Sequence, residues 1–212
     1  SGNRKYRDEY IVIGALFDHL GVGGDGSGSR NPNEIAVHPG ADDNASGIAG
    51  LLELAQKLTS HKSRLKRSIL LIGFDAEEKG LLGARHFTEH PFVDLENIIT
   101  MINMDMIGRM KDSSVTAGGV GTSPAFRPLL DSLSRARGFD LNMTFPGFGP
   151  SDQTSFYKKQ IPVLHFFTGT HRDYHRPGDD WEKINITGMA RIIDMIERVI
   201  VETADTRERP RY

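Results

Sequence analysis

The chain has 212 residues, of which 38% are hydrophobic and 25% charged, and its formal net charge is −2. This length supports one well-buried core, so we expect a single domain over 1–212 with a tail over about 205–212. The near-neutral balance gives no electrostatic case for binding nucleic acid or an anionic membrane, and no apolar run is long enough to span one. The absence of cysteine excludes disulfides and thiolate metal sites.

Four short apolar runs rich in Ile, Val and Phe are typical of strands that are buried on both faces. They cover 10–16, 69–74, 99–104 and 161–167. Between and after them, apolar spacing and helix-end signals predict helices over 46–58, 80–90, 124–137 and 187–203. Alternating strands and helices predict an α/β fold, a three-layer sandwich with a largely parallel central sheet flanked by helices.

The segment GVGGDGSGSRNPN, residues 21–33, contains the spacing G-x-G-x-x-G after a strand. The residues that follow it, SGSRNPNE, do not open the helix that would hold a pyrophosphate, and the chain has no G-K-[ST] motif. We therefore do not expect nucleotide binding.

Acidic and imidazole side chains follow the predicted strands, where ligands of open α/β sheets bind. Glu77 and Glu78 follow the strand 69–74, Asp105 follows 99–104, and Tyr174 and His175 lie in TGTHRDYHRPGDD after the last strand. Asp42 and Asp43 stand just before the helix 46–58. Taken alone, these aspartates are typical of a helix N-cap, and the glutamates are typical of the charged first turn of the helix predicted over 80–90. Together they favour one site at the carboxyl ends of the strands.

Asp105 lies between two methionines at the end of an apolar strand, so its charge needs a strong partner, such as a metal ion. Oxygen and nitrogen ligands without sulfur suit zinc, with manganese or cobalt as alternatives. Of two adjacent glutamates, one can ligate the metal while the other acts as a base. A base beside a metal ion is suited to hydrolysing an amide.

The chain resembles the co-catalytic zinc aminopeptidases, a family that includes bacterial leucyl aminopeptidases and, more distantly, glutaminyl cyclases. The matching segments are IVIGALFDHLG, HPGADDNASG, FDAEEKGLLGARHF, INMDMIGR and SDQTSFYKKQIPVLHFFTGTHRDYHRPGDD. The resemblance covers nearly the whole chain, but the sheet strands that precede the first motif in the family are not included. It implies a peptide substrate with a free N-terminus, and it favours a secreted or periplasmic location.

The resemblance also implies a role for each matching residue. Asp43 would bridge two zinc ions, Glu78 and His175 would complete one zinc site, and Asp105 would ligate the other zinc. Glu77 would be the general base, and Tyr174 would donate a hydrogen bond to the developing oxyanion.

Two residues depart from the family pattern. Leu16 occupies the position of the histidine in GAH-x-D, although Asp18, the usual orienting acid, is present. Gln153 follows Asp152 where the family usually reads SDH. His19 could replace the missing histidine only if the backbone turns sharply after Phe17, because residues 17 and 19 share the opposite strand face from 16 and 18. We therefore do not expect His19 to take the place of the missing histidine.

The sequence is compatible with three functions: a zinc aminopeptidase, a glutaminyl-cyclase-like acyltransferase with a single zinc, and a catalytically impaired relative that binds peptides. In each metal-binding case we expect one tight zinc, held by Asp43, Glu78 and His175. The second zinc, beside Asp105, should be weak or absent because leucine offers no lone pair. Asp18, His19 and Asp152 are assigned to the surroundings of the site without a defined role, and the sequence does not indicate an oligomeric state.

Overall fold

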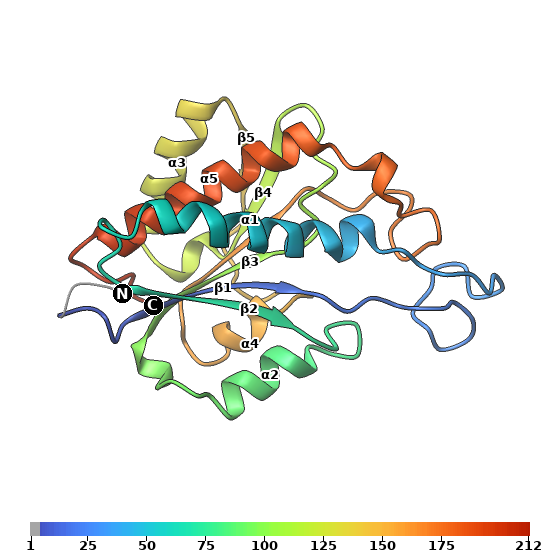
Figure 1. The fold of residues 1–212 in the computed structure, drawn as a ribbon, viewed down its shortest axis with the longest axis horizontal. Helices are drawn as coiled ribbons and strands as arrows, with labels where there is room; N and C mark the ends of the chain where they lie inside the picture. Colours follow the sequence, from blue (N-terminus) through green and yellow to red (C-terminus); the bar gives the residue numbers. More distant parts are fainter. Residues whose placement is uncertain (1–4) are drawn as a thin grey trace.

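The computed structural model describes residues 5–212 as one six-stranded sheet covered by helices (Figure 1). The strands are β1 (Tyr10–Leu16), β2 (Ser68–Phe74), β3 (Ile98–Met104), β4 (Ser114–Gly118), β5 (Asp140–Met143) and β6 (Val163–Phe167). Their order in the sheet is β2-β1-β3-β6-β4-β5. The pair β4–β6 is antiparallel, whereas β1–β2, β1–β3, β3–β6 and β4–β5 are parallel, so the sheet is largely parallel, as predicted.

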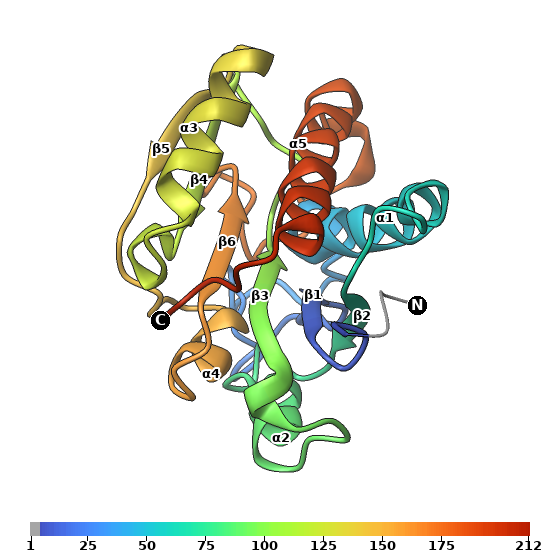
Figure 2. The ribbon, with the colours of Figure 1, turned by 90° about the vertical axis from the view of Figure 1, so that its left-hand side faces the viewer.

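Helices cover both faces of the sheet. In Figures 1 and 2 one group of helices lies on one face of the sheet and a second group lies on the opposite face. The first group is α1 (Gly47–Ser60), α3 (Phe126–Arg137) and α5 (Ile186–Asp205), and the second is α2 (Leu82–Glu89) and α4 (Gln153–Tyr157). This three-layer arrangement confirms the predicted fold class.

Alternating side chains of the sheet build two cores. Ile11 and Ile13 of β1 pack in the larger apolar cluster with α1 and α5, whereas Val12 packs in the smaller cluster with Phe87 of α2 and Phe156 of α4. Burial on both faces explains why the central strands are continuous apolar runs. Among the described residues, no helix is long and apolar enough to cross a membrane.

The observed elements follow the predicted ones closely, with two extra strands. The predicted strands and long helices are all present, with ends that differ by a few residues. The strands β4 and β5 and the short helix α4 were not predicted. Residues 206–212 follow α5 without regular structure; within them Pro210 is buried and the ring of Tyr212 lies 5.8 Å from that of Tyr157.

The sheet brings four loops together. Because β1, β2, β3 and β6 run in parallel, their carboxyl ends lie at the same edge of the sheet. The segments that follow these strands carry His19, Glu78, Asp105 and His175, respectively. A fifth segment, the irregular turn η1 (Ala41–Ser46), carries Asp43 to the same edge just before α1.

Candidate metal centre

Three side chains that the sequence analysis assigns to one zinc lie together at this edge. His175 Nε2 is 3.2 Å from Asp43 Oδ2 and 3.3 Å from Glu78 Oε2. The side chains are largely buried, with exposed fractions of 14%, 6% and 7%, respectively. Their donor atoms therefore converge on one small region, although they come from three separate segments.

His19 also lies in this cluster, beside Glu78 rather than Asp105. Its Nδ1 is 3.0 Å from Glu78 Oε1, and its ring centroid is 5.8 Å from that of His175. The alternation of a strand no longer applies at residue 19, because β1 ends at Leu16 and the chain continues as a loop. One ligand atom each from His19, Asp43 and Glu78 lie within 4.8 Å of one another.

The donor set fits a zinc ion. Both ring nitrogens of His19 and Oε1 of Glu78 are buried and have no hydrogen-bond partner. The 3.0 Å approach of Nδ1 to Oε1 thus lacks the angular geometry of a hydrogen bond. Buried polar atoms without partners are costly, and a cation held between imidazoles and carboxylates would satisfy them.

The electrostatics of the cluster are compatible with a cation at this position. Burial acts against the charged form of Glu78, but its contacts with His175 and His19 outweigh burial and lower its pKa to about 2. Burial likewise disfavours the His175 cation, yet Asp43 and Glu78 raise its pKa to about 10. Without a metal, protonated His175 supplies the positive charge that the carboxylates require. Metal binding would displace that proton.

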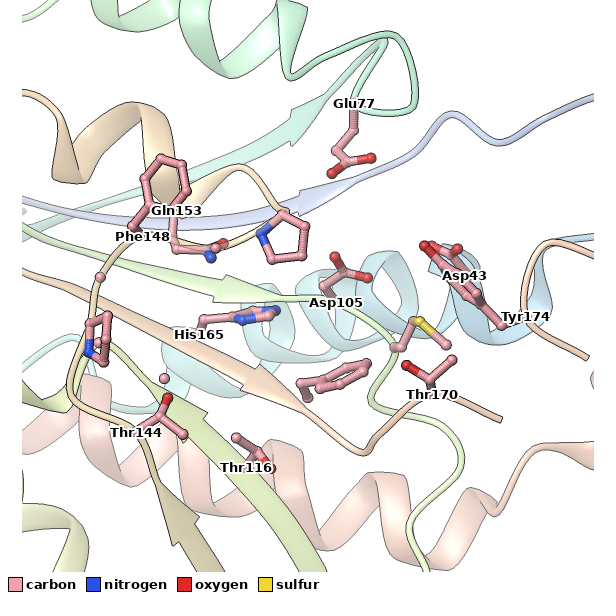
Figure 3. A pocket seen from close by; sticks show the side chains of 18 of the residues that line it. Asp43, Glu77, Asp105, Thr116, Thr144, Phe148, Gln153, His165, Thr170 and Tyr174 are labelled. Carbon is pink, nitrogen blue, oxygen red and sulfur yellow. The ribbon is translucent and has the colours of Figure 1, made fainter. Parts of the chain in front are cut away.

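Glu77 and Asp105 face the cavity beside this cluster, as Figure 3 shows. Burial, together with the charges of Asp105 and Asp152, raises the pKa of Glu77 to about 9. Burial and the charge of Asp43 also raise the pKa of Asp105 well above its usual value. These two carboxyl groups lack a cationic partner of the kind that Glu78 has, so in the absence of metal they favour the protonated form.

Tyr174 lines the same cavity next to His175. The centroids of the two rings are 3.9 Å apart, and the Arg30 guanidinium lies 4.9 Å from the tyrosine ring. Burial and the nearby carboxylates raise the pKa of Tyr174, so its hydroxyl keeps its proton and can donate a hydrogen bond.

The three remaining predicted positions surround the cluster. Leu16 is fully buried at the end of β1. Asp18 accepts hydrogen bonds from the backbone N–H groups of Glu77 and Glu78, at 2.9 and 3.3 Å, and so holds the loop that carries both glutamates. Asp152 is buried with both carboxylate oxygens unpaired, and burial together with the charge of Asp18 raises its pKa to about 7.

Asp179 supports the site and was not identified from the sequence. Its Oδ2 accepts from the backbone N–H groups of Asp42 and Asp43, at 2.9 and 3.0 Å, and Arg109 donates to its Oδ1 at 3.0 Å. Asp179 lies in the quoted segment HRPGDD, but an acidic pair in a loop does not reveal which backbone it binds. The structure shows that it fixes the turn that presents Asp43.

A cavity of about 420 Å³ opens beside the cluster. The carboxylates lie at one end, and Thr116, Thr144, Gln153 and His165 line the other (Figure 3). Burial lowers the pKa of His165 to about 4, so this imidazole is neutral at physiological pH, and its Nε2 is buried without a hydrogen bond. His165 could not be recognised as a cavity residue from the sequence, because it lies inside the apolar run of β6.

The pattern of peptidase family M28 matches residues 1–200, and the chain belongs to this family. It is similar to aminopeptidase YwaD of Bacillus subtilis, with 28% identity over 189 residues, 84% of this chain and 41% of the relative. It is also similar to the uncharacterized protein YfbL of Escherichia coli, with 27% identity over 216 residues, 87% of this chain and 64% of the relative. The chain therefore spans less than two thirds of either relative.

Solved structures give the same assignment. The zinc aminopeptidase BSAP of Bacillus subtilis has a TM-score of 0.77 and 25% identity, covering 98% of this chain and 48% of that one. A glutaminyl cyclase of Porphyromonas gingivalis has a TM-score of 0.72 at 19% identity, covering 94% of this chain and 75% of that one. This second comparison shows similarity of fold alone. The family resemblance seen in the sequence is thereby confirmed.

Proposed function

We propose that the protein is a zinc-dependent aminopeptidase that releases the first residue of a peptide. The observation that carries the proposal is the convergence of Asp43, Glu78 and His175 beside a buried glutamate, Glu77, at one end of a cavity. Membership of a peptidase family supports it, as does the similarity to proteins named as aminopeptidases and zinc metalloproteases.

Asp43, Glu78 and His175 would hold the zinc ion. Zinc, when bound, supplies a Lewis acid that polarises a carbonyl group and acidifies water. Leu16 offers no ligand atom, so Asp105 and Asp43 are left to hold any second ion, and we expect that ion to bind weakly.

Glu77 and Tyr174 would carry the proton transfer and the charge stabilisation. Glu77 takes a proton from the attacking water and returns it to the leaving amine, the role of a general base that later acts as an acid. The Tyr174 hydroxyl, which keeps its proton, donates a hydrogen bond to the oxyanion that develops from the carbonyl group.

The cavity favours a substrate with a free N-terminus. A protonated α-amino group placed beside Asp105 and Glu77 would supply the cationic partner that they lack, lower their raised pKa values and stabilise their ionised forms. The part of the cavity lined by Thr116, Thr144 and His165 would then receive the side chain of the first residue.

Zinc content and product analysis test the proposal together. We expect the unmodified protein to bind zinc and release an amino acid from an aminoacyl amide, and Glu78→Ala to lose most of the metal and the activity. Glu53→Ala, an exposed glutamate on α1, is the control and should lose neither. Full zinc occupancy in Glu78→Ala would contradict the ligand assignment. Release of ammonia from a peptide with N-terminal glutamine, without peptide hydrolysis, would favour a cyclase, and no product from either substrate would favour a peptide-binding role.

A further inference from the structure

We propose that His19 is a direct ligand of the metal ion held by Asp43, Glu78 and His175. The site would then have four protein ligands, two imidazoles and two carboxylates. This inference rests on the proposed function only in placing a metal at this cluster. It assigns to His19 a role that compensates in part for the leucine at position 16.

The distances support direct ligation. His19 Nδ1 is 3.0 Å from Glu78 Oε1, while His175 Nε2 is 3.3 Å from the other oxygen of the same carboxylate. Glu78 thus has one imidazole on each oxygen, and Asp43 contributes a third donor within 4.8 Å of both Glu78 and His19. Zinc bonds to nitrogen and oxygen are about 2 Å long, so donors a few ångströms apart can share one ion.

A hydrogen bond from His19 to Glu78 is the competing interpretation, and it explains the contacts less well. A buried imidazole that serves only to orient a carboxylate should have hydrogen-bond partners at its ring nitrogens, because buried polar groups are normally paired. Both nitrogens of His19 are buried without a hydrogen-bond partner, as is Oε1 of Glu78. At least one of these nitrogens therefore has a lone pair available to a metal ion.

The ring of His19 is also held in place by its surroundings. A Cβ atom added at Gly40 would lie 2.7 Å from Cγ and Cδ2 of His19, so the imidazole packs directly against the backbone of this glycine. Gly40 immediately precedes the turn η1 that carries Asp43. The backbone that presents Asp43 thus also orients His19, and the side chain is only 10% exposed.

X-ray absorption spectroscopy of the zinc-loaded protein tests the ligand count without any mutation. Imidazole rings give a characteristic multiple-scattering signal, and we expect two rings per zinc in the unmodified protein and one in His19→Ala. One ring in the unmodified protein would overturn the inference.

Zinc affinity, measured by competition with a chelator, gives a second test. We expect His19→Ala and His19→Asn each to weaken binding by more than about 100-fold, beyond the 10- to 100-fold cost of losing a group hydrogen-bonded to a ligand. His86→Ala, an exposed histidine on α2, should bind as the unmodified protein does. Asparagine can still donate a hydrogen bond to Glu78, so near-normal affinity in His19→Asn would overturn direct ligation. Circular dichroism should establish that each variant is folded.

The outcomes separate this inference from the proposed function. Zinc bound by two imidazoles without peptide hydrolysis would overturn the aminopeptidase assignment and support the role of His19. Peptide hydrolysis by a protein whose zinc is bound by one imidazole would support the aminopeptidase assignment and overturn the proposed role of His19. A protein that binds no zinc would overturn both.

Discussion

Glu77 and Glu78 are adjacent in sequence, yet their surroundings differ. The imidazoles of His175 and His19 contact Glu78 and lower its pKa to about 2 despite burial. Glu77 faces the cavity among other carboxyl groups, and burial with their charges raises its pKa to about 9. The same residue type is therefore suited to ligation at one position and to proton transfer at the next.

The first prediction separates these two roles. Glu77→Gln should leave zinc content nearly unchanged, because glutamine removes a base and not a ligand. The rate of peptide hydrolysis should fall by ~10² or more, the range typical of general bases. Zinc analysis and a turnover assay on the same preparation measure both effects. Loss of the metal together with the activity would show that the assignments of the two glutamates are reversed.

The second prediction concerns Leu16, which is fully buried at the end of β1. Leu16→His should add a second tightly bound zinc, because the new imidazole would join Asp105 and Asp43 as a third ligand. Turnover of an aminoacyl amide should rise with it. Zinc titration of both proteins gives the stoichiometry, and Leu16→Met, which keeps the volume without adding imidazole, is the control. Two tight zinc ions in the unmodified protein would contradict the assignment of position 16 as a missing ligand.

At the level of elements, the turn η1 is held by a neighbouring loop. Asp179 is fully buried, accepts from two backbone N–H groups of the turn and pairs with Arg109. The side chain of the adjacent Asp180 accepts from the backbone N–H of Trp181, at the start of a short 3₁₀ turn. Two neighbouring aspartates thus differ in their contribution to the structure: Asp179 holds the turn η1, whereas Asp180 caps a short 3₁₀ turn.

This contrast gives the third prediction. Asp179→Ala should lower the free energy of unfolding by about 3 to 5 kcal/mol, because it leaves two buried backbone N–H groups without their acceptor and leaves Arg109 with only its 3.5 Å contact to Asp173. It should also weaken zinc binding, because the turn that presents Asp43 loses its anchor. Asp180→Ala should cost about 1 kcal/mol, the typical value of a lost helix cap. Urea denaturation of the two variants is the measurement, and equal costs would contradict the proposed anchor.

The central strands could be predicted because they are buried on both faces, which leaves a continuous apolar run such as IVIGAL in β1. The strands β4 and β5, SVTAG and DLNM, are short and partly exposed, so they lack that signal. Asp43, Glu78 and His175 could be assigned to one edge because each follows or precedes a predictable element. The position of His19 could not be predicted, because strand periodicity ends at Leu16 and loop conformation then decides where a ring points.

On the scale of the whole molecule, acidic side chains are concentrated at one edge of the sheet, and this affects the stability of the metal-free protein. Asp152 is an extreme case, because its two oxygens are buried without a hydrogen bond and its pKa is raised from 3.8 to about 7 by burial and by Asp18. The unfolded chain releases this proton near pH 3.8, and the folded protein keeps it until about pH 7. Asp152 therefore lowers stability progressively as the pH rises from about 4 to about 7, and the cost persists above that range.

The fourth prediction follows from this loss of stability with rising pH. In the metal-free protein, Asp152→Asn should raise the free energy of unfolding by about 4 kcal/mol near pH 8, the value of a pKa shift from 3.8 to about 7. The gain should shrink as the pH is lowered, and it should vanish near pH 4. Denaturant titrations at several pH values measure it, with Asp25→Asn, an exposed residue, as the control. A difference that does not change with pH would indicate a packing effect rather than a charge effect.

His175 has a backbone φ of 55°, in the left-handed region that costs non-glycine residues about 1 kcal/mol. Glycine should therefore be tolerated here better than alanine, the reverse of the usual order, while both remove the imidazole. We expect His175→Gly to unfold at higher urea concentration than His175→Ala and to be inactive until free imidazole is added to fill the vacated space. Titrating imidazole against activity would test this chemical rescue, and its success would turn the protein into a peptidase switched on by a small molecule.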